Sequence, residues 1–338
     1  MVVTLADVAK HAGVSLATAS RVINNSPHNV TESLRQRVLQ AVEELHYVPN
    51  AHARALVQSS TATVGVIVHD VSDPYFAEIT RGIQQVAAEA NKLLIICNSY
   101  RHAERELAYV DMLHAQKVDA IVIAGSGRND RQFSANMARR IEMYTRGGGR
   151  VAFIGRHPVA GDVVLPENVR GGQIVGEYLV GMGHRHIGVI TGPAFLTTTE
   201  DRLYGFNSIL QQAGVELPPE YIVECDFSRD GGQEAAQELL GRSLPLTAIF
   251  ALNDLMAVGA MAALREQGLA LPHDISVIGF DNIAITRDVT PALTTVDVPL
   301  VEMGALAMQL ALAPPEPTFR IEHQPVKLII RDSVCQLK

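Results

Sequence analysis

Apolar residues near the amino terminus recur at helical spacing. Positions 5, 8, 9 and 12 are Leu, Val, Ala and Ala, which places them on one stripe of a helix. Thr4 and Asp7 have the spacing of a capping box at its start. Gly13 can adopt the left-handed conformation that ends a helix, and Ser15 can cap a second helix soon afterwards. The pattern therefore predicts two short helices joined by a tight turn.

The second helix is expected to turn Ala19, Val22 and Ile23 inward. Its start and outer face would then carry residues suited to meeting DNA base edges, namely Leu16, Ala17, Ser20 and Arg21. A third helix, capped by Thr31 and running to about residue 45, would close a small core. This is the layout of a helix-turn-helix, although any compact three-helix domain could show the same caps.

From residue 63 onward, short apolar runs alternate with helical stretches. Continuous apolar strands separated by helices are typical of parallel sheets covered on both faces. Two sets of about four strands suggest two similar doubly wound α/β lobes, and a last strand is expected at 326–330. The expected strands of the two sets are residues 64–68, 93–97, 120–124 and 151–154, then 187–190, 222–225, 248–251 and 276–279.

Charge is distributed unevenly along the 338 residues, whose formal net charge is −8. Residues 1–58 carry five basic and four acidic side chains, so the acidity belongs to the remainder. A first segment this weakly basic would hold phosphates through local arginines, helix N-termini and duplication in a dimer. We therefore expect modest non-specific DNA affinity.

The remaining composition excludes several classes of protein. Cys97, Cys225 and Cys335 lie far apart without paired spacing, so neither a disulfide framework nor a metal site is expected. The first ten residues lack the apolar core of a signal peptide, and no apolar run reaches membrane-spanning length. These features favour a cytoplasmic protein without a membrane partner. No catalytic or cofactor motif is found: the 125–127 segment is not a nucleophile elbow, and the 147–149 glycines lack a phosphate-loop lysine.

The first 56 residues resemble the headpiece of the lactose- and galactose-repressor family of bacterial regulators. The likeness is carried by the segments at 4–9, 12–15 and 20–22, by Thr18 and Asn24, and by 45–50 and 53–56. The resemblance implies a headpiece at 1–49, a hinge helix and linker at 50–60, and a periplasmic-binding-protein-like core at 61–334. The first lobe is expected at about 61–157 and 297–314, and the second at 158–296 and 318–334. According to the resemblance, the residues that contact DNA are Thr4, Ser15, Leu16, Ala17, Thr18, Ser20, Arg21, Asn24, Asn50, Ala53, Arg54 and Leu56.

The segment at 51–58 is too short to be a stable helix alone. The resemblance implies that two such segments, one from each subunit, fold in the minor groove and insert Leu56 between bases. An ordinary linker that happens to contain a leucine is the alternative.

Ligands of open α/β sheets bind beyond the carboxyl ends of the strands. The residues there that match the family's segments, or that could contact a polyol, are Asp73, Phe76, Ser126, Arg156, Arg202, Phe227, Asn253 and Asp281. Arginine, amide and carboxylate groups beside aromatic rings suit a sugar. Asp73, Ser126 and Arg156 could equally bond one lobe to the other. Asp254 is expected to cap a helix, and Asp70 to bind backbone N–H groups.

The sequence therefore predicts a regulator, most simply a repressor, that binds a near-palindromic operator as a homodimer under the control of a small effector. Some members of the family carry a heptad tail after the last strand that joins dimers into tetramers, and only a few residues follow that strand here, so the resemblance implies a dimer. A solute-binding protein with the same core is the alternative, and an enzyme on a doubly wound fold is a third hypothesis.

Overall fold

The computed structural model describes residues 3–24, 30–48 and 61–337. They form two units, one ending at Ala62 and the other beginning at Thr63. The first unit contains α1 (Leu5–Ala12), α2 (Leu16–Ile23) and α3 (Glu32–Glu44). Its small core holds Val8, Ala19, Val22 and Val38, so the predicted inward faces are confirmed. Thr31 precedes α3, but its side chain does not cap the helix as expected.

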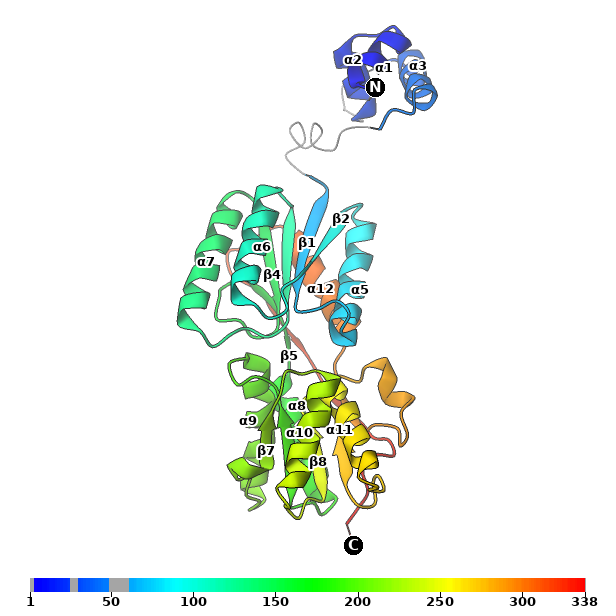
Figure 1. Cartoon of the computed structure of the whole chain (residues 1–338). Helices are drawn as coiled ribbons and strands as arrows, with labels where there is room; N and C mark the ends of the chain where they lie inside the picture. Colours follow the sequence, from blue (N-terminus) through cyan, green and yellow to red (C-terminus); the bar gives the residue numbers. More distant parts are fainter. Residues whose placement is uncertain (1–2, 25–29, 49–60, 338) are drawn as a thin grey trace. The chain divides into compact units, whose positions relative to one another are not determined.

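The second unit begins with a six-stranded parallel sheet in the order β11-β5-β4-β3-β1-β2. Its strands are β1 (Thr63–Val68), β2 (Leu93–Asn98), β3 (Ala120–Ala124), β4 (Arg150–Ile154), β5 (Asp162–Pro166) and β11 (Ile321–Gln324). The helices of this first lobe are α5 (Pro74–Glu89), α6 (Ala103–Ala115), α7 (Arg131–Arg146) and α12 (Leu300–Leu312). They lie on both faces of the sheet (Figure 1), which is why β1, β3 and β4 are apolar almost throughout.

The second lobe has a four-stranded parallel sheet in the order β7-β6-β8-β9. Its strands are β6 (Ile187–Thr191), β7 (Ile222–Glu224), β8 (Ala248–Ala251) and β9 (Ser276–Ile278). Its helices are α8 (Asn168–Gly181), α9 (Thr197–Gln212), α10 (Arg229–Gly241) and α11 (Asp254–Glu266), with short 3-10 turns at Pro219–Tyr221 and Ala284–Arg287. A two-stranded antiparallel ribbon pairs β10 (Thr295–Asp297) with β12 (Lys327–Ile329).

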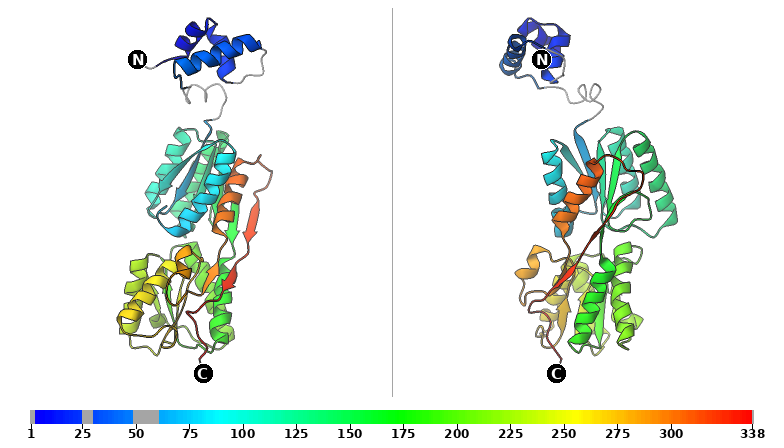
Figure 2. Two further views of the ribbon diagram at one scale, coloured as in Figure 1. Left: turned by 90° about the vertical axis from the view of Figure 1, so that its right-hand side faces the viewer. Right: turned by 180° about the vertical axis from the view of Figure 1, so that it is seen from behind.

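The predicted lobe boundaries need two corrections. β5 pairs with β4, so the first lobe extends past residue 157. β11 pairs with β5, so residues 321–324 also belong to the first lobe and the segment after 318 does not lie wholly in the second. The chain thus passes between the lobes three times within residues 61–337: after β5, after β10 and after β11 (Figure 2). The last strand is β12, slightly shorter than the 326–330 expected.

Three pairs of helices pack at glycines, without side chains between their backbones. A Cβ added to Gly205 of α9 would lie 2.0 Å from the carbonyl oxygen of Val169 in α8. The same is true where α5 meets α12 at Gly82 and Gly304, and where α10 meets α11 at Gly259. Such contacts are below any van der Waals separation, so these positions require glycine.

Candidate functional site

The turn between α1 and α2 has the predicted local structure. The Thr4 hydroxyl and the Asp7 side chain form a reciprocal capping box, and Gly13 ends α1 with φ of 62°. Ser15 caps α2 by accepting a hydrogen bond of 3.1 Å from the backbone N–H of Thr18. Arg37 of α3 donates to the carbonyl oxygens of Ala12 and Gly13, which fixes α3 against the turn. These contacts hold α2 at a defined angle in the unit.

One face of α2 lies outside the core of the first unit. Leu16 is 53 % exposed, Ala17 and Arg21 are also exposed, and Ala19 and Val22 are buried on the opposite side. Ser20 is half-buried and accepts a hydrogen bond from Asn24. The predicted contact residues on α2 therefore lie at its start and along one side, as a helix that enters a groove requires. Thr4, in contrast, uses its hydroxyl to bind Asp7. Asn50, Ala53, Arg54 and Leu56 lie outside the described residues.

The two lobes of the second unit meet at the carboxyl ends of their strands. The backbone N–H of Thr197, at the start of α9, donates to Gly127 (3.0 Å), and the N–H of Asn129 donates to Phe195 (2.9 Å). Arg101 crosses between the lobes and donates to the carbonyl oxygen of Asp226 at 2.6 Å. The lobes are therefore in contact along the edge where the family resemblance predicts the effector.

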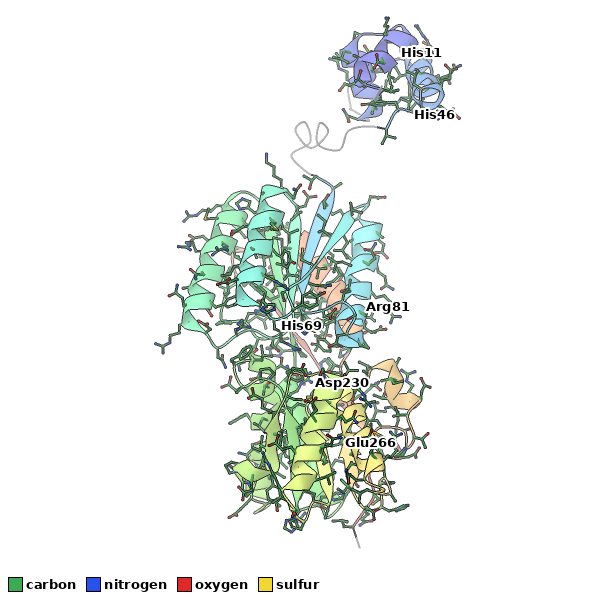
Figure 3. All side chains as sticks on the ribbon, in the orientation of Figure 1. His11, His46, His69, Arg81, Asp230 and Glu266 are labelled. Carbon is green, nitrogen blue, oxygen red and sulfur yellow. The ribbon has the colours of Figure 1, made fainter. Side chains whose placement is uncertain are left out.

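A cavity of about 50 Å³ lies at this boundary. It brings together three of the predicted effector residues, Phe76, Ser126 and Phe227. His69, which follows β1, also lines it, and Figure 3 shows His69 at the end of the first lobe that faces the second.

Other lining residues were not predicted from the sequence. They are charged or polar and come from the loops after β2 and β3 and from α6: Ser99, Arg101, Glu106 and Arg128. Arg101 and Arg128 lie in loops at the carboxyl edge of the sheet, and this position is the signal that could have found them. Neither residue lies in the family segments on which the prediction was based.

Arg202 and Asp281 form a second, fully buried cluster. The guanidinium of Arg202 donates to Asp281 at 2.7 Å, to Asn168 at 2.9 Å and to the carbonyl oxygen of Leu252, and it lies 3.7 Å from the ring centre of Phe280. Arg202 is only 2 % exposed. Burial raises the pKa of Asp281 to about 6, although Arg202 acts in the opposite direction. Two of the predicted effector residues are thus paired with each other.

Asn253 takes the capping role that was expected of Asp254. Asn253 caps α11 by accepting from the N–H of Met256, and its amide also donates to the carbonyl oxygen of Phe227 at 3.0 Å. Asp254 is not the cap, because it lies inside the first turn and accepts hydrogen bonds from Ile283 and Thr295. Burial raises the pKa of Asp254 well above its usual value.

The remaining predicted residues serve the connections around the cavity. Arg156 forms ion pairs with Glu200 (2.6 Å) and Asp201 (2.7 Å) across the lobes, which is the bonding alternative left open for it. Asp73 caps α5 by accepting from Tyr75, and burial raises its pKa. Asp70 accepts from the N–H of Ser72, as predicted.

Two histidines at the cavity are held neutral by their surroundings. Burial lowers the pKa of both His69 and His157 to about 4. His157 contacts the carbonyl oxygen of Gly125 at 3.0 Å, and as a neutral ring it donates there through Nε2. Each neutral ring has one donor and one acceptor, and His157 already uses its donor on Gly125.

Among the described residues, no helix is long and apolar enough to cross a membrane.

Comparisons with known proteins agree with both units. Residues 4–50 match the family described as bacterial regulatory proteins, lacI family, and residues 177–334 match the periplasmic binding protein-like domain. The HTH-type transcriptional repressor PurR of Edwardsiella ictaluri is 37% identical over 337 residues, which span 98% of this chain and 97% of that protein.

Solved structures give the same result. A Lac repressor dimer bound to operator and the anti-inducer ONPF has a TM-score of 0.84 at 26% identity, covering 99% of this chain and all of that one. The transcriptional regulator CelR in complex with cellobiose has a TM-score of 0.71 at 29% identity, covering 98% and 99%. The similarity includes the helix-turn-helix, which a solute-binding protein lacks, and the relatives are regulators and not enzymes. The chain therefore belongs to the lacI family of bacterial transcriptional regulators, with a helix-turn-helix unit and an effector-binding core.

Proposed function

We propose that the chain represses transcription by binding a near-palindromic operator as a homodimer, and that a sugar-like effector in the interlobe cavity controls this binding. The observation that carries the proposal is the coexistence of an exposed face on α2 with a polar and aromatic cavity at the lobe boundary. Its relatives include a repressor seen as a dimer on its operator and a regulator seen with cellobiose.

On the DNA side, Ser15, Leu16, Ala17, Thr18, Ser20 and Arg21 are the proposed contacts of α2 in the major groove. Leu16 and Ala17 present apolar surface suited to thymine methyl groups, and Arg21 can reach guanine or phosphate. The headpiece at 1–49 and the hinge at 50–60, with Leu56 as a minor-groove wedge, complete this proposal. The proposal includes a cytoplasmic location, since a regulator must meet its operator there.

An edge of the first lobe supports self-association. β2 ends the six-stranded sheet, and its Leu93 and Ile96 are 70 % and 44 % exposed. Apolar side chains on an unpaired edge strand need cover, and a second copy of the chain would supply it.

On the effector side, Phe76 and Phe227 would cover the apolar faces of a ring, and Ser126 would bind a hydroxyl group. Asn253 would respond through its hydrogen bond to the backbone of Phe227, and the Arg202–Asp281 pair through the hydrogen bond of Arg202 to the neighbouring Leu252. Asp73 and Arg156 would set the contact between the lobes. By linkage, DNA must change effector affinity by the same factor by which the effector changes DNA affinity.

The test is a gel shift of the full chain with DNA from upstream of its own gene, repeated over a range of salt concentrations and with candidate sugars. We expect a specific complex that weakens steeply with salt and responds to at least one sugar. A complete lack of salt-dependent binding to its own upstream DNA and to other promoter fragments would contradict the proposal.

A further inference from the structure

Two arginines that were not among the predicted effector residues, Arg101 and Arg128, line the interlobe cavity. Arg101 lies in the loop after β2, where Tyr100 and Arg101 both have positive φ angles, 51° and 57°. Such angles are unfavourable for residues other than glycine, so the surrounding structure holds this loop in place. The Arg101 guanidinium lies 5.3 Å from the ring centre of Phe227 in the other lobe.

Arg128 is coupled to Arg101. Its guanidinium donates to the carbonyl oxygen of Arg101 at 3.0 Å and lies 4.3 Å from the ring centre of Phe195. Both arginines are partly buried, and burial lowers the pKa of Arg101. Two desolvated guanidinium groups thus share one wall of the cavity.

The charges that could balance them are few. Glu106 is the one carboxyl group among the described residues that line the cavity, and its pKa is raised by burial, which favours its neutral form. Asp73 and Asp226 lie within electrostatic reach of Arg101, but each already accepts a backbone hydrogen bond, from Tyr75 and Ser228. His69 is neutral at pH 7. Among the described residues that line the cavity, two guanidinium groups therefore face one carboxyl group, while Asp73 and Asp226 lie outside the lining.

Two nitrogen atoms of this lining also lack partners. Arg128 Nε and His69 Nδ1 are buried and make no hydrogen bond to any described residue. Buried polar groups are nearly always paired, so each unpaired atom calls for an explanation. A guanidinium N–H can only donate, and it is best satisfied by a negatively charged oxygen.

We propose that the effector is an anionic sugar, whose phosphate or carboxylate group binds between Arg101 and Arg128. The sugar ring would lie against Phe76 and Phe227, with Ser126 and Glu106 beside its hydroxyl groups. This inference rests on the proposed function in taking the interlobe cavity as the effector site. It adds that a neutral sugar offers no negatively charged oxygen to the unpaired Nε of Arg128.

The anion site can be tested without knowing the effector. Binding of inorganic phosphate to the full chain is measured by calorimetry and thermal unfolding, against sodium chloride of the same ionic strength. Loss of a charge-assisted hydrogen bond should weaken phosphate binding roughly ten- to a hundredfold in Arg101→Gln and Arg128→Gln. Arg105→Gln is the matched control, because Arg105 is exposed and lies over Tyr100 outside the cavity.

The Arg105→Gln control also corrects for the general stabilisation of proteins by phosphate, because that effect should be equal in all variants. Equal phosphate binding by the wild type, Arg128→Gln and Arg105→Gln would overturn the proposal. The proposal would also be overturned if phosphate stabilised the wild type no more than this general effect predicts.

A second experiment separates the sources of negative charge and the two levels of the hypothesis. Glucose, gluconate and glucose 6-phosphate are compared as ligands, and then as modulators of operator binding. We expect the two anions to bind more tightly than glucose, and their order identifies carboxylate or phosphate. Tighter binding and regulation by glucose would refute the anionic site and leave the proposed regulator intact. Anions that bind through Arg128 but change no DNA complex would instead refute the proposed control by this cavity.

Discussion

Removal of Arg202 should destabilise the core far more than removal of an exposed interlobe arginine. Arg202→Ala leaves the buried Asp281 carboxyl group without its ion-pair partner at 2.7 Å. It also removes the donors to Asn168 and Leu252. Arg202 therefore stabilises the second lobe through these bonds, independently of any contribution to effector binding.

The magnitude follows from burial. Both side chains of the pair are nearly inaccessible, at 2 % and 5 % exposure, and breaking a buried pair on one side costs about 3–5 kcal/mol. Arg156 is the natural comparison, because its own side chain is 43 % exposed and its partners Glu200 and Asp201 are 54 % and 16 % exposed. Ion pairs of that kind contribute about 0–1 kcal/mol.

The measurement is urea unfolding of the full chain followed by far-ultraviolet circular dichroism, for the wild type, Arg202→Ala and Arg156→Ala. A third variant, Arg202→Met combined with Asp281→Asn, removes both charges. Because replacing both partners avoids an unpaired buried charge, it should recover part of the lost stability. The transition of the second unit is the one to compare, since the two units need not unfold together.

The reasoning would be refuted if Arg202→Ala and Arg156→Ala lost the same small amount of stability. It would also be refuted if the double variant were less stable than Arg202→Ala. If it holds, tests of effector binding at this position need Asp281→Asn as well, since the alanine variant changes stability and affinity together.

Three further predictions address the other sites. First, the neutral state of His157 favours the native fold above its unfolded pKa of 6.5, so its contribution to stability should be lost as the pH falls from 6.5 toward 4. The difference in unfolding free energy between the wild type and His157→Asn should shrink by up to about 3 kcal/mol over that range. A difference that stayed constant would contradict the assignment. Second, Gly205→Ala should destabilise the core by about 1–3 kcal/mol in urea unfolding, whereas Gly181→Ala, whose Cβ would meet nothing within 4 Å, should not. Third, if Arg21 contacts phosphate, Arg21→Ala should reduce the salt dependence of operator binding by roughly one ion per subunit, whereas an unchanged slope with relaxed base preference would indicate a guanine contact.

The apolar pattern predicted most of the architecture. The strand expected at 64–68 is β1 (Thr63–Val68), and the helix-turn-helix has the predicted caps. These elements are specified by local signals: capping side chains, a left-handed glycine, and apolar runs long enough to be buried. The rule that ligands bind beyond the carboxyl ends of the strands then gave the cavity residues Ser126 and Phe227, and the family match gave Phe76.

Features that depend on pairing between distant segments were missed. β11 reads as Ile-Glu-His-Gln and is largely exposed, so its sequence carries no strand signal, and its place beside β5 follows from tertiary structure. For the same reason the sequence does not show that Asn168, Leu252 and Asp281 surround Arg202. Arg101 reaches the cavity only because its loop has an unusual backbone conformation.

The glycine contacts between helices limit how the core can deform. Backbones that touch directly have no intervening side chains to change rotamer, so a pair such as α8 and α9 cannot slide without a clash. Each lobe should therefore behave as a stiff body, and strain introduced at the crevice must be absorbed where the chain passes from one lobe to the other. Because the lobe does not deform, its motion would be transmitted in full to Thr63, the first residue of the second unit.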